Sequence, residues 1–172
     1  MNLTQERLKE LLTYSPETGE FFWRGLKRKN RQKGLRAGTT NGRGYRQITV
    51  DKVIYLEHRL AWLYMTGEFP LLTIDHKDQD KSNNKWDNLR EATSSENQWN
   101  GSKPKRGNKR GENLPAGVYH SNGRYIATIR YQGCKHYLGC FKTPEEAGEA
   151  YKVASLKFHG EFSPFFERKE NE

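Results

Sequence analysis

The segment from Ile74 to Asn100, IDHKDQDKSNNKWDNLREATSSENQWN, contains the residue types of a hydrolytic metal site. An acid, Asp75, stands beside an imidazole, His76, at the end of a short apolar run, and several asparagines follow. Hydrolysis of a phosphodiester needs a base that deprotonates water and a metal ion that stabilises charge on the phosphate and the leaving oxygen. Both requirements are met within this one segment.

The acid and the amides suit Mg²⁺, which prefers hard oxygen ligands and keeps several waters, so that two protein oxygens suffice. Asp75 and one downstream amide make such a pair. A histidine base works best when an acceptor holds its second ring nitrogen and fixes the tautomer. An asparagine oxygen does this without adding negative charge. Asn83 and Asn84 are better interpreted individually as turn residues of the loop.

Regular elements are predicted on both sides of this loop. The order is strand, loop, strand and helix, carried by LLTIDH, KDQDKSNNK, WDNLREAT and SSENQWN. Thr93 or Ser94 is expected to cap the closing helix. So small a unit has little core of its own, and we expect it to pack on an amphipathic helix over 57–66 that ends at Gly67.

The N-terminal part predicts further short elements. Thr4 is typical of a helix N-cap, and the helix face extends to Leu12. FFW, after the turn SPETGE, predicts a short strand, and YRQITVDKVIYL predicts a strand pair that turns near Asp51. The basic segment 25–44, which contains several glycines, predicts a long loop or an irregular hairpin.

Composition and charge favour two small domains that contact a polyanion. Hydrophobic residues make up only 33% of the 172 residues, so two modest cores are favoured over one deep core. The net charge is +9, and nine lysines and arginines with no acid fall between Arg24 and Arg46. Aromatic-rich sequence flanks this run and the second one, GSKPKRGNKRGEN, which favours nucleic acid over solvated tails. The residues predicted to contact DNA in these runs are Arg24, Lys27, Arg28, Lys29, Arg31, Lys103, Lys105, Arg106, Lys109 and Arg110.

Cysteine content and hydropathy predict a reduced, cytoplasmic protein. Two cysteines are too few for a disulfide framework, and no apolar run approaches the roughly 18 residues of a membrane span. We therefore expect no membrane contact. A zinc site of Cys134, His136 and Cys140 is disfavoured because the spacing is not CxxC, and His136 is expected to pack beneath a sheet.

A second domain is predicted over 116–172, after a basic linker at 101–115. Three short strands are expected in GVYHSNGRYIATIRYQGCKHYLGCFK, and Asn122-Gly123 is a strong hairpin signal. Thr143 and Glu146 form a capping box at the start of the helix that follows. This pattern predicts a three-stranded antiparallel sheet with one helix across its back.

The segment 55–100 resembles the HNH endonucleases, most closely the phage homing type with the ββα-metal motif. EHRLAW, IDHKD, NN, DNLREAT and SENQ carry the resemblance. It implies that His76 is the general base, that Asp75 and Asn97 hold one Mg²⁺ or Mn²⁺, and that Asn88 orients the base. It also implies a phage-encoded protein that acts in the bacterial host cell.

The second domain is similar to the APETALA2/ERF DNA-binding domain over residues 117–162, most specifically in YLGCF, EEAGEAY and FHG. That family lays its sheet in the major groove of DNA. Strand alternation independently turns Tyr125, Ala127 and Ile129 toward the helix. The predicted DNA-facing residues are Tyr119, Ser121, Arg124, Thr128, Arg130, Lys135 and Tyr137. Tyr119 and Ser121 stand where the family usually has arginines, which favours phosphate contact over base readout.

These features predict a metal-dependent, site-directed DNA endonuclease of α+β fold. The predicted parts are an HNH domain at 1–100 with its ββα-metal core at about 71–100, the linker at 101–115 and the second domain at 116–172. Double-stranded DNA is the expected partner, and Arg59 is a further candidate for phosphate contact beside a structural His58. A monomer is expected, which favours nicking unless two chains pair on DNA.

Two other functions fit parts of the sequence. The first is a non-catalytic DNA-binding regulator in which the nuclease domain is a relic, and the second is a binder of structured RNA. A relic is expected to have lost at least one of the four site residues. Their joint presence therefore favours the enzyme.

Overall fold

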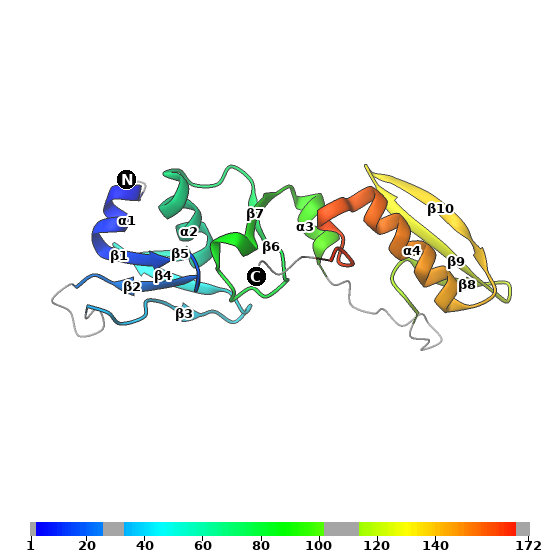
Figure 1. Cartoon of the computed structure of the whole chain (residues 1–172), viewed down its shortest axis with the longest axis horizontal. Helices are drawn as coiled ribbons and strands as arrows, with labels where there is room; N and C mark the ends of the chain where they lie inside the picture. Colours follow the sequence, from blue (N-terminus) through cyan, green and yellow to red (C-terminus); the bar gives the residue numbers. More distant parts are fainter. Residues whose placement is uncertain (1–2, 26–32, 102–113, 168–172) are drawn as a thin grey trace. The chain divides into compact units, whose positions relative to one another are not determined.

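The computed structural model describes residues 3–25, 33–101 and 114–167 (Figure 1). The chain forms two compact units, Met1–Ser94 and Ser95–Glu172. Helices and antiparallel sheets occur in both units, so the fold is α+β as predicted. Within the described ranges, the helices are too short or too polar to cross a membrane.

The first unit begins with α1 (Gln5–Leu11), which Thr4 caps by accepting a hydrogen bond from the Arg7 amide at 3.2 Å. The predicted helix face includes Leu12, but Leu12 is extended and starts β1 (Leu12–Ser15). It pairs with Trp23 of β2 (Glu20–Trp23), so ladder hydrogen bonds replace another helical turn. The SPETGE turn joins the two strands as predicted.

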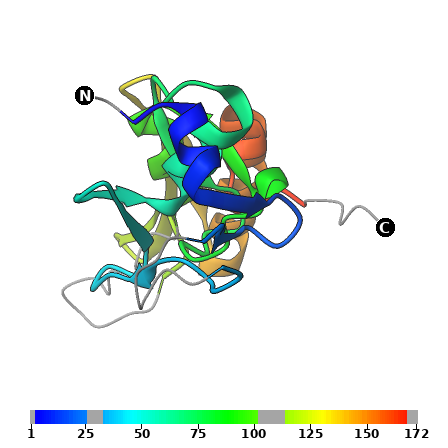
Figure 2. The same ribbon diagram turned by 90° about the vertical axis from the view of Figure 1, so that its left-hand side faces the viewer.

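A three-stranded antiparallel sheet contains β3 (Thr39–Thr40), β4 (Arg46–Val50) and β5 (Val53–Leu56). Asp51 and Lys52 turn the predicted hairpin with φ of 46° and 70°, which is the positive-φ pair of a type I′ turn. Strand β5 leads directly into α2 (Glu57–Thr66), and Gly67 ends that helix at φ 91°. Helices α1 and α2 pack on each other above these strands (Figures 1 and 2).

The strand–loop–strand segment follows α2. Strand β6 (Thr73–His76) pairs antiparallel with β7 (Leu89–Ala92), and the 3₁₀ turn η1 (Trp86–Asn88) leads into β7. Helix α3 (Ser94–Asn100) comes next, so the predicted order of strand, strand and helix is confirmed. Apart from Ser94, α3 belongs to the second unit.

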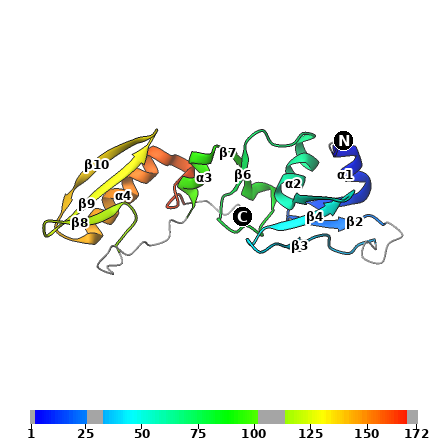
Figure 3. The ribbon, with the colours of Figure 1, turned by 180° about the vertical axis from the view of Figure 1, so that it is seen from behind.

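The second unit contains the predicted sheet and helix (Figure 3). Strands β8 (Val118–Ser121), β9 (Arg124–Tyr131) and β10 (Cys134–Phe141) lie in the order β10-β9-β8, and all pairs are antiparallel. Helix α4 (Pro144–His159) crosses one face, and the 3₁₀ turn η2 (Gly160–Phe162) follows. The predicted capping box is present, with Thr143 accepting from the Glu146 amide at 3.2 Å.

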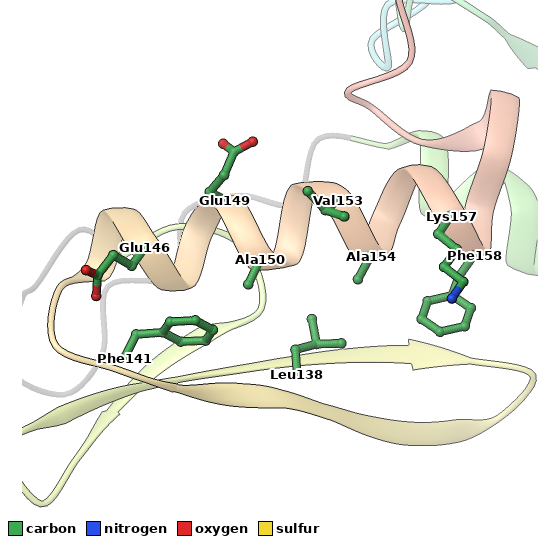
Figure 4. Close-up of a pocket in the computed structure, with 9 residues that line it drawn as sticks. All are labelled: Leu138, Phe141, Glu146, Glu149, Ala150, Val153, Ala154, Lys157 and Phe158. Carbon is green, nitrogen blue, oxygen red and sulfur yellow. The ribbon is translucent and has the colours of Figure 1, made fainter.

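The core of this unit lies between β9 and α4. Ala127 and Ile129 are buried against the helix, as the alternation predicts. An apolar groove lies between α4 and β10 and is lined by Leu138, Phe141, Ala150, Val153, Ala154 and Phe158 (Figure 4). His136 stacks on Phe158 with ring centroids 5.5 Å apart, which confirms its predicted place beneath the sheet.

Helix α3 packs within the second unit through one aromatic side chain. Trp99 stacks on His159 with ring centroids 4.5 Å apart and planes 8° apart, and it lies 5.8 Å from Tyr131. His159 is itself held by the Ser155 hydroxyl and the Arg130 carbonyl oxygen, each at 3.3 Å. The helix that carries Asn97 is therefore anchored to β9 and α4.

Candidate active site

His76 ends β6 and is buried, and its ring contacts a buried amide. Its Nε2 lies 3.0 Å from Asn84 Oδ1. The Asn84 Nδ2 donates in the other direction, to Glu57 Oε2 at 3.2 Å. Because an amide oxygen only accepts, His76 Nε2 carries a proton, and in the neutral form of the ring the lone pair is then at Nδ1.

Asn84 is held in place by the β1–β2 region. Its backbone oxygen accepts a 2.6 Å hydrogen bond from the Tyr14 hydroxyl, and its side chain is only 1% exposed. Gly19, at φ 74°, comes so close that a Cβ there would lie 2.4 Å from the Asn84 carbonyl carbon. Asn84 was predicted to serve only a turn, and this expectation was wrong. A buried amide with partners on both edges does more than shape a loop.

The Asn88 side chain bonds within the loop that follows His76. Its Oδ1 accepts from the Asp78 amide at 3.0 Å, and its Nδ2 donates to Asp78 Oδ1 at 2.9 Å and to the Asn83 carbonyl at 2.8 Å. These bonds close the loop between β6 and β7. Asn84 is a hydrogen-bond partner of the His76 ring, and the predicted role of Asn88 in orienting the base stays a prediction. Asn83 serves the turn as predicted, accepting from the Lys85 amide at 3.4 Å.

Asp75 faces Arg90 across the β6–β7 pair. The Arg90 Nε and Nη2 both donate to Asp75 Oδ2, at 2.9 and 2.8 Å, and both side chains are nearly buried. The two charge-assisted bonds hold the predicted metal ligand in one orientation. They also place a cation beside the carboxylate that is predicted to bind metal.

The donor set still fits a hard divalent cation, because it combines a carboxylate with an amide oxygen. Among the described residues, groups of three or more His, Cys, Asp or Glu that would hold a metal are absent. A site of one carboxylate and one asparagine needs no such group. Asn97 lies half-buried on α3, in the second unit, and its role as the second ligand stays a prediction.

A second histidine borders the first. The rings of His58 and His76 meet edge to face with centroids 5.1 Å apart, and Tyr45 lies 5.5 Å from His58. Burial lowers the pKa of His58 to about 3, and the neighbouring His76 and Arg59 add to this shift. Its Nδ1 has no hydrogen-bond partner among the described residues. His58 is therefore a neutral packing partner of the His76 ring.

Glu57, at the start of α2, is the site residue that the sequence analysis missed. Its side chain is fully buried and accepts from Arg46 Nε at 2.6 Å. Burial raises its pKa, while the Arg46 charge and hydrogen bond oppose that shift. Helical spacing could have indicated this burial, because Leu60 and Ala61, three and four residues after Glu57, lie on the same helix face and are buried.

The open face of the second unit's sheet carries the predicted DNA-facing residues. They are Tyr119, Ser121, Arg124, Thr128, Arg130, Lys135 and Tyr137, all on the side away from α4. Arg124 and Arg130 are exposed, Lys135 is paired with Arg130 across the strands, and Lys135 Nζ lies 5.0 Å from the Tyr119 ring. The sheet thus presents a basic and aromatic surface.

Other predicted DNA contacts are only partly described. Arg24 is exposed and donates to the Lys9 carbonyl at 2.8 Å, and Arg59 lies 5.8 Å from the Phe69 ring. The remaining ones lie outside the described residues: Lys27, Arg28, Lys29, Arg31, Lys103, Lys105, Arg106, Lys109 and Arg110.

Comparison with known proteins separates the two parts of the chain. Residues 55–99 match the HNH endonuclease family model. This HNH segment contains Glu57, His76 and Asn84. An uncharacterised HNH endonuclease of Acanthamoeba polyphaga mimivirus is 32% identical over 108 residues, which span 62% of this chain and 54% of that protein.

The second similarity is to plant regulators. An AP2-like ethylene-responsive transcription factor of Oryza sativa subsp. japonica is 50% identical over 58 residues, which span 31% of this chain and 9% of that protein. An AP2-like factor of Arabidopsis thaliana is 48% identical over the same length and spans 10% of that protein. The chain thus matches only about a tenth of these plant proteins. The AP2-like resemblance predicted from the sequence is confirmed.

A solved structure titled as DNA binding and cleavage by the HNH homing endonuclease I-HmuI is also similar. The two chains are 29% identical, with a TM-score of 0.39. The similar region covers 49% of this chain and 48% of the other chain. The predicted resemblance to HNH endonucleases is confirmed by the family model.

Proposed function

We propose that this chain is a divalent-metal-dependent DNA endonuclease that hydrolyses phosphodiesters with His76 as general base. The hydrogen bond of His76 Nε2 to Asn84 Oδ1 is the observation that supports this function most directly. It leaves Nδ1 as the acceptor for a proton of the attacking water. The HNH family match over the same residues supports the choice of reaction.

Asp75 and Asn97 are the residues proposed to hold the ion. A bound Mg²⁺ or Mn²⁺ supplies charge stabilisation at the phosphate and the leaving oxygen. Arg90 holds the Asp75 carboxylate in one orientation through two hydrogen bonds. His58 and Tyr45 pack against the His76 ring.

We further propose that the open face of the β8–β10 sheet binds double-stranded DNA. Arg124, Arg130 and Lys135 offer three cations on one face, and phosphate contacts of this kind make binding strongly salt-dependent. Each neutralised phosphate contributes about 0.9 to the slope of log K against log salt. A slope that falls by about that amount in Arg130→Gln supports a phosphate contact there.

A plasmid-nicking assay tests the catalytic part. Supercoiled plasmid carrying a verified target is incubated with the protein and Mg²⁺ or EDTA, alongside His76→Ala. His120→Ala is the matched control, because His120 lies on β8 in the other unit. We expect nicking with Mg²⁺, its loss with EDTA and in His76→Ala, and its retention in the control. Equal nicking by His76→Ala rules out the proposed base.

One observation favours a different function. The ion pair of Arg90 with Asp75 occupies the carboxylate proposed to bind metal, as expected of a DNA-binding regulator with a relic nuclease domain. Under that alternative the chain binds the verified target without cutting it, with any divalent cation. Metal-dependent nicking in the assay above excludes the alternative.

A further inference from the structure

A buried acid stands behind the base and its amide. Glu57 is fully buried, and its Oε2 accepts both from Arg46 Nε at 2.6 Å and from Asn84 Nδ2 at 3.2 Å. Arg46 is fixed in turn, because its Nη2 donates to the Ala37 carbonyl at 2.8 Å. A continuous line of contacts therefore runs from Arg46 through Glu57 and Asn84 to His76.

The amide in this line has two edges with opposite chemistry. An asparagine side chain accepts at its oxygen and donates at its nitrogen, and its other partners decide which edge faces which neighbour. A carboxylate only accepts, so Glu57 takes the Nδ2 edge of Asn84. The Oδ1 edge is then left to His76, whose Nε2 must donate.

The choice is one-sided when Glu57 is a carboxylate, a state that burial opposes by raising the pKa of Glu57. A protonated carboxyl carries a donor as well as an acceptor, so it would form a hydrogen bond with either the oxygen or the nitrogen of the amide. Arg46, at 2.6 Å, favours the carboxylate. The other oxygen, Oε1, has no hydrogen-bond partner among the described residues, so a proton placed there would find no acceptor.

We propose that Glu57, paired with Arg46, is a positioning residue that fixes His76 in the Nε2–H tautomer through Asn84. Glu57 does not touch the reacting atoms. It determines which ring nitrogen is available as the base, and this catalytic consequence rests on the function proposed above. The tautomer itself is a property of the folded chain without DNA or metal.

Nitrogen-15 NMR of the histidine rings measures this property directly. In metal-free protein, at a pH where His76 is neutral, we expect an N–H-type shift at Nε2 and a lone-pair-type shift at Nδ1. His76→Ala assigns the signals. In Glu57→Gln the Asn84 amide is free to turn, and an Nδ1–H population has to appear.

The matched control is Glu20→Gln, which also removes a carboxylate paired with an arginine in the same unit. Glu20 Oε1 lies 2.8 Å from Arg36 Nη1, on β2. This variant is expected to leave the His76 signals unchanged. An unchanged Nε2–H form in folded Glu57→Gln overturns the proposal, as does an Nδ1–H form in the unsubstituted protein.

An exchange of the two groups tests the chemistry apart from folding. In Glu57→Gln with Asn84→Asp, the carboxylate sits at position 84 and the amide at position 57. The new carboxylate accepts from His76 Nε2, so the pure Nε2–H form is expected to return. If Glu57→Gln alone does not fold, the double variant provides the test. An Nδ1–H population in the folded double variant overturns the proposal.

Activity gives a second readout once nicking is established. An equal mixture of tautomers halves the competent fraction, so kcat of Glu57→Gln is expected to fall at least about twofold. KM for DNA stays the same because Glu57 is buried. If the unsubstituted protein cuts no DNA, the proposed function fails while the NMR result still decides the tautomer.

Discussion

Replacing Arg90 by methionine provides a direct test of whether Asp75 binds metal. The change removes the cation from a buried pair whose side chains are 10% and 5% exposed, and it keeps the apolar bulk of the arginine stem. Breaking a buried pair by removing one partner costs about 3–5 kcal/mol, because the other charge is left uncompensated. We expect Arg90→Met to lower the free energy of unfolding by this amount in EDTA.

Mg²⁺ is then expected to restore much of the loss, because it can take the place of the guanidinium beside Asp75. A ligand at 100 times its Kd stabilises the native state by about 2.7 kcal/mol. Urea denaturation followed by circular dichroism, with Mg²⁺ or EDTA, measures both values. Unfolding of Arg90→Met that does not respond to Mg²⁺ refutes the assignment of Asp75 as a metal ligand.

Two variants separate this effect from general damage. Arg36→Met breaks the more exposed pair with Glu20, for which a loss of about 0–1 kcal/mol and no response to Mg²⁺ are expected. Asp75→Asn combined with Arg90→Met removes the uncompensated charge, so the free energy of unfolding should partly recover without Mg²⁺. The response to Mg²⁺ should then disappear.

Three further predictions concern the packing around the site and the second unit. Gly19→Ala forces a Cβ to within 2.4 Å of the Asn84 backbone at a positive φ; we expect a loss of more than about 1–2 kcal/mol in urea unfolding and a shifted Asn84 signal in NMR spectra. An unchanged midpoint would contradict that packing. Trp99→Ala removes the stack on His159 and is expected to destabilise the second unit by about 3–5 kcal/mol, measured on the unfolding transition of that unit. The pKa of His58 is depressed in the folded chain to about 3, so its contribution to stability is present above the ordinary value near 6.5 and is lost as the pH falls below it. His58→Phe should therefore flatten the decline in stability between pH 6 and pH 4, measured by urea midpoints, and an unchanged slope would refute this role.

Elements fixed by local chemistry were predictable from the sequence. The Asp51-Lys52 and Asn122-Gly123 turns need residues that tolerate positive φ, and both turns occur where the sequence places them. The α4 capping box is likewise a local pattern. Leu12 was misplaced because helix periodicity continues through it, while its actual conformation depends on pairing with Trp23.

The site shows the same division between local and distant causes. Asp75 and His76 are adjacent and end a strand, so their joint position follows from the chain itself. The position of Asn84 does not, because it depends on Tyr14 and Gly19, which precede it by about seventy residues. Nothing in the spacing of the asparagines indicates which of them that upstream turn contacts.

Glu57 illustrates why the residues behind a proposed base are harder to predict than the proposed base itself. An acid in the first turn of a helix is usually exposed, where it complements the helix dipole. Here the same position is fully buried, and its charge is matched by Arg46 from the neighbouring strand pair. A buried charge of this kind is costly unless it serves a purpose that an apolar residue cannot serve. Orienting the Asn84 amide is such a purpose, because an apolar side chain leaves both edges of the amide equivalent.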